Sequence, residues 1–66
     1  MENFKFTSLL AMNPEWVFKA VLDSYKENYV ITNETTKNTI GKDWMTVVSA
    51  EDVEKNIKEG NYKFVH

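Results

Sequence analysis

Sixty-six residues without a cysteine form one small domain that must fold by packing alone, which excludes a disulfide framework, a thiol nucleophile and a thiolate metal site. A content of 42% hydrophobic and 27% charged residues excludes a disordered chain. The formal net charge is −2 and all eight Lys and Arg residues are lysine, which argues against a nucleic-acid-binding protein built on a basic surface or on arginine forks.

Membrane insertion and secretion are also not indicated by the sequence. No stretch approaches the roughly 18–20 consecutive apolar residues that a membrane-spanning helix requires. Residues 1–12 carry an acid at Glu2 and an apolar run only at residues 9–12, unlike a signal peptide. We therefore expect a cytoplasmic protein with no membrane partner. Many Lys, Asn and Tyr residues without arginine are typical of an AT-rich genome, such as that of a low-GC bacterium, its phage or another mobile element.

The first predicted element is a short strand. Phe4 and Phe6 alternate with Lys5 and Thr7, which is the period of a strand with one buried side. The segment 1–12 is therefore expected to be an N-terminal arm or a short edge strand.

The strongest local pattern begins at Asn13. Asparagine is a favourable helix cap, and Pro14 suits the first helical position because its missing N–H is not needed there. The sequence predicts a helix that ends near Asn28 and leads directly into a strand over residues 29–34.

The second half of the chain repeats this pattern in a shorter form. Polar residues 35–38 predict a turn, and residues 39–48 predict the next strand. Ser49 is a favourable cap for a second helix that ends at Gly60. Residues 62–65 then form the last strand.

The predicted fold is a small α+β two-layer sandwich in βαββαβ order. This is the order of a split βαβ, or ferredoxin-like, fold, with two helices on one face of an antiparallel sheet. The two helix–strand units, residues 13–31 and 49–65, align, although any two capped amphipathic helices show the same similarity. If residues 4–9 do not form a strand, the order becomes αββαβ, with the N-terminal arm packed across Trp16.

Three aromatic residues are candidates for contact with a partner. On the predicted first helix Trp16 falls on the polar side, where it contacts either the N-terminal arm or a partner. Trp44 alternates with Met45 along the strand 39–48, so Trp44 lies on the open sheet face beside Tyr62 if Met45 faces the core. We assign Trp16, Trp44 and Tyr62 to a partner-binding surface.

The acids of the second predicted helix complete the candidate set. Glu51, Asp52 and Glu54 lie on its outer surface among lysines, which is typical of a solvated face. The alternative is an acidic surface that binds a basic partner, and the interspersed lysines argue against a mimic of DNA.

These patterns favour a non-catalytic protein that binds another protein as an inhibitor, adaptor or regulator. The only histidine is the last residue, His66, and no spacing of serines, metal ligands or phosphate-binding glycines indicates an enzyme, a metal site or a cofactor. Two alternatives remain. One is single-stranded nucleic-acid binding by open-face aromatics, with Lys37, Lys42 and Lys63 contacting phosphate. The other is a homodimeric structural module.

Overall fold

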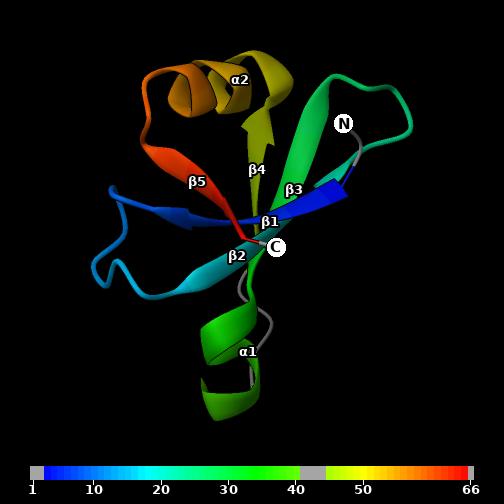
Figure 1. Ribbon diagram of the computed structural model, residues 1–66. Coiled ribbons are helices and arrows are strands. Elements are labelled where there is room, and N and C mark those ends of the chain that lie inside the picture. The colour runs from blue at the N-terminus through cyan, green and yellow to red at the C-terminus, as the bar shows by residue number, and fades with distance from the viewer. Residues whose placement is uncertain (1–2, 41–44, 66) are drawn as a thin grey trace.

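A five-stranded sheet forms the centre of the structure, a computed structural model that describes residues 3–40 and 45–65 (Figure 1). The elements in chain order are β1 (Asn3–Ser8), β2 (Val17–Leu22), β3 (Asn28–Asn33), α1 (Glu34–Ile40), β4 (Met45–Ser49), α2 (Ala50–Lys58) and β5 (Tyr62–Val65). The strands lie in the order β4-β3-β2-β1-β5, and each pair of neighbours is antiparallel. The prediction of an α+β fold with an antiparallel sheet is confirmed.

The two edge strands, β4 and β5, run in the same direction, because three antiparallel strands separate them. Helix α2 connects them across one face of the sheet, whereas α1 lies at the opposite end of the molecule (Figure 1). One face of the sheet is therefore covered by α2 over part of its area, and neither described helix covers the other face.

Side chains alternate between the two faces with the period of two that strands impose. On the face toward α2, Phe6 lies opposite Phe18 in the register of β1 and β2, and Ala20 lies opposite Ile31 in that of β2 and β3. Val53 of α2 is fully buried against this cluster. The core is thus a single layer of apolar side chains between the sheet and α2.

The prediction of a helix after Asn13 is wrong, since residues 17–22 form strand β2. The side-chain oxygen of Asn13 accepts a hydrogen bond from the backbone N–H of Glu15 (2.9 Å), and the N–H of Trp16 donates to the carbonyl of Asn13 (3.2 Å). These bonds close a turn, and an Asn-Pro pair suits a turn as well as a helix cap. Val17 and Phe18 favour strands, and pairing with both β1 and β3 decides the outcome.

The element order is consequently βββαβαβ, and neither βαββαβ nor αββαβ describes the chain. Residues 13–31 contain turns and strands, whereas residues 49–65 contain a helix and a strand, so the apparent repeat has no structural counterpart. Within the segment 1–12, residues 3–8 form β1, which is not an edge strand because it lies between β2 and β5.

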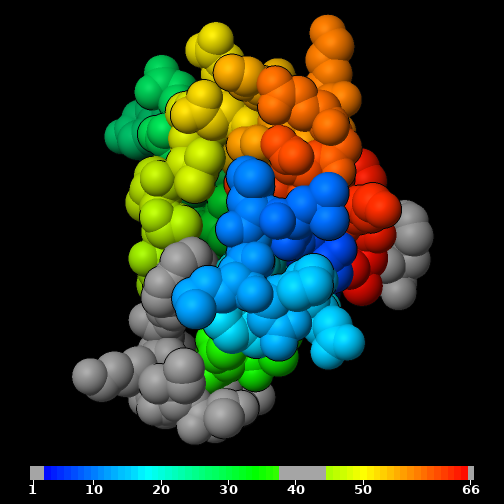
Figure 2. Space-filling view, turned by 90° about the vertical axis from the view of Figure 1, so that its left-hand side faces the viewer, coloured from blue at the N-terminus to red at the C-terminus, as the bar shows by residue number. Residues whose placement is uncertain are grey.

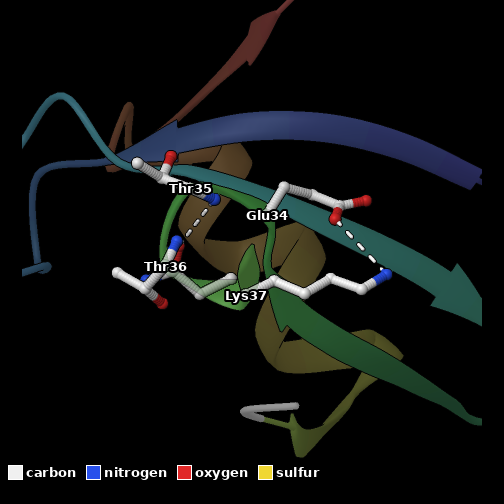
Figure 3. A network of polar contacts seen from close by, with 5 residues as sticks. Glu34, Thr35, Thr36 and Lys37 are labelled. Carbon is white, nitrogen blue, oxygen red and sulfur yellow. Dashed lines mark hydrogen bonds and ion pairs between the residues drawn. The ribbon is translucent and has the colours of Figure 1, made fainter. Parts of the chain in front are cut away.

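Residues 35–38 were predicted as a turn but belong to α1. Residues 39–40, predicted as the start of the strand 39–48, also belong to this helix. The side-chain oxygen of Asn33 caps this helix by accepting from the backbone N–H groups of Thr35 (3.1 Å) and Thr36 (3.2 Å). Glu34 and Lys37 form an ion pair of 3.9 Å on the same turn (Figure 3).

The other predicted boundaries agree with the structure. Residues 4–9 and 29–34 are strands within a residue or so, and the last strand spans residues 62–65 as predicted. The Ser49 hydroxyl caps α2 by accepting from the backbone N–H of Asp52 (3.2 Å). Gly60 has φ +81°, the left-handed conformation that ends the helix at little cost to glycine.

Candidate partner-binding groove

An apolar groove of about 700 Å³ lies on the face of the sheet that α2 partly covers. Its described lining comes from all five strands, the β1–β2 loop and α1, and includes no residue of α2. The residues are Phe6, Ser8, Leu10, Ala11, Met12, Trp16, Phe18, Ile31, Asn33, Thr36, Thr46, Val48 and Tyr62. In Figure 2 the β1–β2 loop, blue to cyan, lies between the side chains of α2 above and the first residues of α1 below.

Residues 9–16, the β1–β2 loop, form one wall of the groove. The N–H of Leu9 donates to the carbonyl of Asn61 (2.9 Å), and the N–H of Leu10 donates to the Ser8 hydroxyl (3.1 Å). At the other end of the loop, the N–H of Val17 donates to Thr35 Oγ1 (2.8 Å). These bonds fasten the loop to the α2–β5 connection and to α1, so its apolar side chains are held at the rim.

The rim carries apolar side chains that water reaches. Leu10 is 66% exposed and Met12 is 94% exposed. Trp16 is half-buried and packs against the core. Exposed apolar side chains next to an apolar groove indicate a binding surface, because covering them with another molecule is energetically favourable.

The floor of the groove is buried and aromatic. Phe6 is 2% exposed, and its ring centre lies 5.5 Å from that of Phe18 and 4.4 Å from that of Tyr62. Burial raises the pKa of the Tyr62 hydroxyl above its usual 10.0, and the negative charge of Asp52 adds to this shift. A carboxylate therefore lies near the Tyr62 side of the groove.

The two buried polar side chains of the groove lining already have partners. Ser8 is buried and its hydroxyl accepts from the N–H of Leu10, while the buried Asn33 caps α1. Within residues 3–40 and 45–65, no three His, Asp or Glu side chains stand close enough together to hold a metal ion. The groove therefore suits an apolar group better than a polar substrate.

The structure brings two of the predicted site residues together, since Trp16 and Tyr62 line the same groove. Trp16 arrives there from a loop and not from the polar side of a helix. Leu9 and Leu10 are 63% and 66% exposed, and Leu10 lines the same groove as the half-buried Trp16. Trp44 lies outside the residues that the structure describes.

The three predicted acids, Glu51, Asp52 and Glu54, are exposed on α2. None of them lines the groove, and Asp52 alone is tied to it, through its effect on Tyr62. All three acids therefore lie on the outer surface of α2, and Asp52 is the one whose negative charge acts on Tyr62.

Sequence reasoning missed Leu10 and Met12, the exposed part of the rim. The available signal was the apolar run at residues 9–12 directly before the Asn-Pro pair. If Asn13 is interpreted as a turn and not as a helix cap, this run belongs to a surface loop, where apolar residues are unexpected.

The orientation of β4 bears on the nucleic-acid alternative. Thr46 and Val48 face the groove, whereas Met45 and Val47 point to the open face and are 61% and 64% exposed. The aromatic residues of the described strands face the groove or the core, so the open-face aromatic platform that base stacking needs is missing from the described part of the chain.

No helix in the described part of the chain is long and apolar enough to cross a membrane. Comparison with protein families, curated proteins and solved structures finds no match to this chain. The chemistry of the groove is therefore the main guide to function.

Proposed function

We propose that this is a non-catalytic protein that binds another protein as an inhibitor, adaptor or regulator. In this proposal the groove receives apolar side chains from a short segment of the partner. The observation that carries it is the apolar groove of about 700 Å³ in which Trp16 and Tyr62 meet the exposed Leu10 and Met12. The source and compartment expected from composition, a phage or mobile element and the cytoplasm, belong to the same proposal.

Burial of the rim supplies the affinity. A fully buried Leu or Met side chain is stabilised by about 1.5–3 kcal/mol relative to an exposed one, so the rim and the entering side chains together support a specific contact. Trp16 and Tyr62 belong to the residue types that most often dominate binding energy, and both are held in place by the core.

Charge at the rim indicates the chemistry of the partner segment. Asp52 lies near Tyr62, and the exposed Glu15 directly precedes Trp16. Lys37, on α1, is already paired with Glu34. We therefore expect apolar residues flanked by Lys or Arg, because opposite charges at a rim accelerate association and select the partner.

Two competing hypotheses are outcomes of the same test. A second copy of the chain would cover the groove in a homodimer, and single-stranded nucleic acid would stack its bases on exposed aromatic side chains. The apolar lining and the neighbouring carboxylates favour a protein segment over phosphate.

The experiment is selection of short peptides from a random display library on the immobilised protein. The expected result is a family of peptides with apolar residues flanked by Lys or Arg. Leu10→Ala with Met12→Ala should weaken their binding by about tenfold or more, because these truncations remove apolar contact area without touching the core.

Tyr25→Ala is the matched control, since Tyr25 is 81% exposed but is no part of the groove lining. It should leave peptide affinity unchanged. Selected peptides without an apolar consensus, or an equal loss of affinity in both variants, would contradict the proposal. Tight oligonucleotide binding would also contradict it. So would a dimer in sedimentation that Leu10→Ala with Met12→Ala dissociates.

A further inference from the structure

The open face of the sheet, opposite the groove, has an unusual charge pattern. Lys5 on β1 and Lys19 on β2 are direct neighbours in the register, and both point away from α2. Lys63 on β5 points to the same side, opposite Thr7. The outward-facing positions of all five described strands include no Asp or Glu. In a protein of net charge −2, the described strands thus present only positive charges on this face.

These lysines have no compensating partner within the described chain. Among residues 3–40 and 45–65 the ion pair within 4 Å is Glu34 with Lys37, which leaves Lys5, Lys19 and Lys63 without a carboxylate. Like charges directly opposite each other on neighbouring strands destabilise a sheet. The arrangement is unfavourable for the isolated chain and becomes favourable when an anionic molecule covers it.

The same face has an apolar half beside the lysines. Val21, Val30 and Val47 lie in one row across β2, β3 and β4. On the edge strand β4, Met45 is paired with Thr32 of β3, and Thr32 is paired with Lys19 of β2, so the apolar and basic halves are adjacent. Met45 and Val47 are 61% and 64% exposed. An occupant must therefore present negative charge on one side and apolar groups on the other.

We propose that this open face is a second docking surface, which binds an acidic amphipathic segment of a protein. Phosphate of a nucleic acid would meet the lysines but would leave the valines and Met45 uncovered, and no aromatic residue of the described strands faces this side. Helix α2 of a second copy has exposed acids, but its Val53 is buried in its own core, so it offers no apolar stripe. An acidic segment with an apolar stripe matches both halves of the face.

This surface lies on the other side of the sheet from the groove, so the inference does not rest on the proposed function. If both hold, the protein has two docking surfaces of opposite charge preference, which is the property of an adaptor.

The test uses a labelled synthetic helical peptide with glutamate along one side and leucine along the other, followed by fluorescence anisotropy. Lys5→Glu with Lys19→Glu should weaken its binding by at least about tenfold, and Lys5→Gln with Lys19→Gln should give an intermediate loss. The neutral pair keeps the result interpretable if the reversed pair folds less well, which circular dichroism reports.

Lys55→Glu with Lys58→Glu, two exposed positions on α2, is the control of equal charge change and should change affinity by less than about twofold. Leu10→Ala with Met12→Ala should also leave this peptide's affinity unchanged, which separates this surface from the groove. A scrambled peptide of the same composition should bind more weakly.

Three results would overturn the inference. The first is failure of the acidic peptide to bind the unmodified protein. The second is equal loss in the sheet-face and α2 variants, which indicates a nonspecific charge effect. The third is tighter binding of an oligonucleotide or of phosphatidylserine vesicles, lost in Lys5→Glu with Lys19→Glu, which would assign the face to nucleic acid or to a lipid surface.

Discussion

At the scale of single residues, Asp23 closes the turn between β2 and β3. Its Oδ1 accepts from the backbone N–H of Glu27 (3.1 Å) and its Oδ2 from the side-chain amide of Asn28 (3.4 Å), while Lys26 has φ +60°. Desolvation raises the pKa of Asp23, but hydrogen bonds donated by Glu27, Asn28 and Lys26 outweigh it and hold the pKa below 3.8.

A lowered pKa makes this turn sensitive to acid. The folded state holds the carboxylate more tightly than the unfolded state, so its stabilising effect is present above pH 3.8 and is lost as the pH falls through the lower, folded pKa. Asp23→Asn should therefore be less stable than the parent in urea unfolding at pH 7, and the difference should shrink below pH 3.8. An unchanged difference would contradict the role of the charged form.

Tyr62 provides the opposite case. Its pKa is raised, first by burial and then by Asp52, so the neutral phenol is the stabilising form. That contribution is complete below pH 10.0 and is lost as the pH rises through the folded pKa.

In an absorbance titration of the folded protein, one ionisation step should therefore occur above pH 10.0. This step should be absent in Tyr62→Phe. Asp52→Asn should move this step toward lower pH, because it removes a negative charge that opposes ionisation. A titration curve unaffected by Asp52→Asn would place that carboxylate too far from the groove to shape its rim.

At the scale of elements, Ser49 determines where α2 begins. Its hydroxyl accepts from the N–H of Asp52, one of the N–H groups that have no partner within the helix. Ser49→Ala should lower the free energy of unfolding by about 1 kcal/mol. The control is Ser24→Ala, at an exposed turn position, which should change it by less than about 0.5 kcal/mol. Similar values for the two variants would contradict the capping role.

Elements whose ends are marked by local chemistry could be predicted from the sequence. Ser49 and Gly60 fixed α2, and the period of two in Phe4 and Phe6 fixed β1. Strand β2 could not be predicted, because Asn13 begins both turns and helices and the apolar positions 17, 18, 21 and 22 fit both periods. Partners on both sides, β1 and β3, settle this choice, and they are distant in sequence.

At the scale of the whole molecule, the sheet separates two surfaces of different chemistry. The groove side has Trp16, Tyr62 and the nearby Asp52, and the open side has Lys5 and Lys19. The sequence shows a net charge of −2 but cannot show this separation, since it arises from strand register. Trp16 and Tyr62 were predicted as partner-binding residues, but their position in one groove with Phe6 and Phe18 follows from the strand order β4-β3-β2-β1-β5.

Because the protein is small, partner binding should measurably raise its free energy of unfolding. A single core of this size supplies only about 3–5 kcal/mol. A peptide present at 100 times its dissociation constant adds about 2.7 kcal/mol to the free energy of unfolding. The melting temperature of the protein should therefore rise clearly with a groove-selected peptide and much less in Leu10→Ala with Met12→Ala. An equal rise in both proteins would place the peptide outside the groove.

The central claim is that a partner segment binds in the groove, and two methionines report on it directly. Met12 is 94% exposed at the groove rim, and Met45 is 61% exposed on the open face. Nuclear magnetic resonance of protein labelled at the methionine methyl groups, titrated with a groove-selected peptide, should shift the Met12 signal and leave that of Met45 in place. A shift of Met45 alone, or equal shifts of both, would contradict binding in the groove.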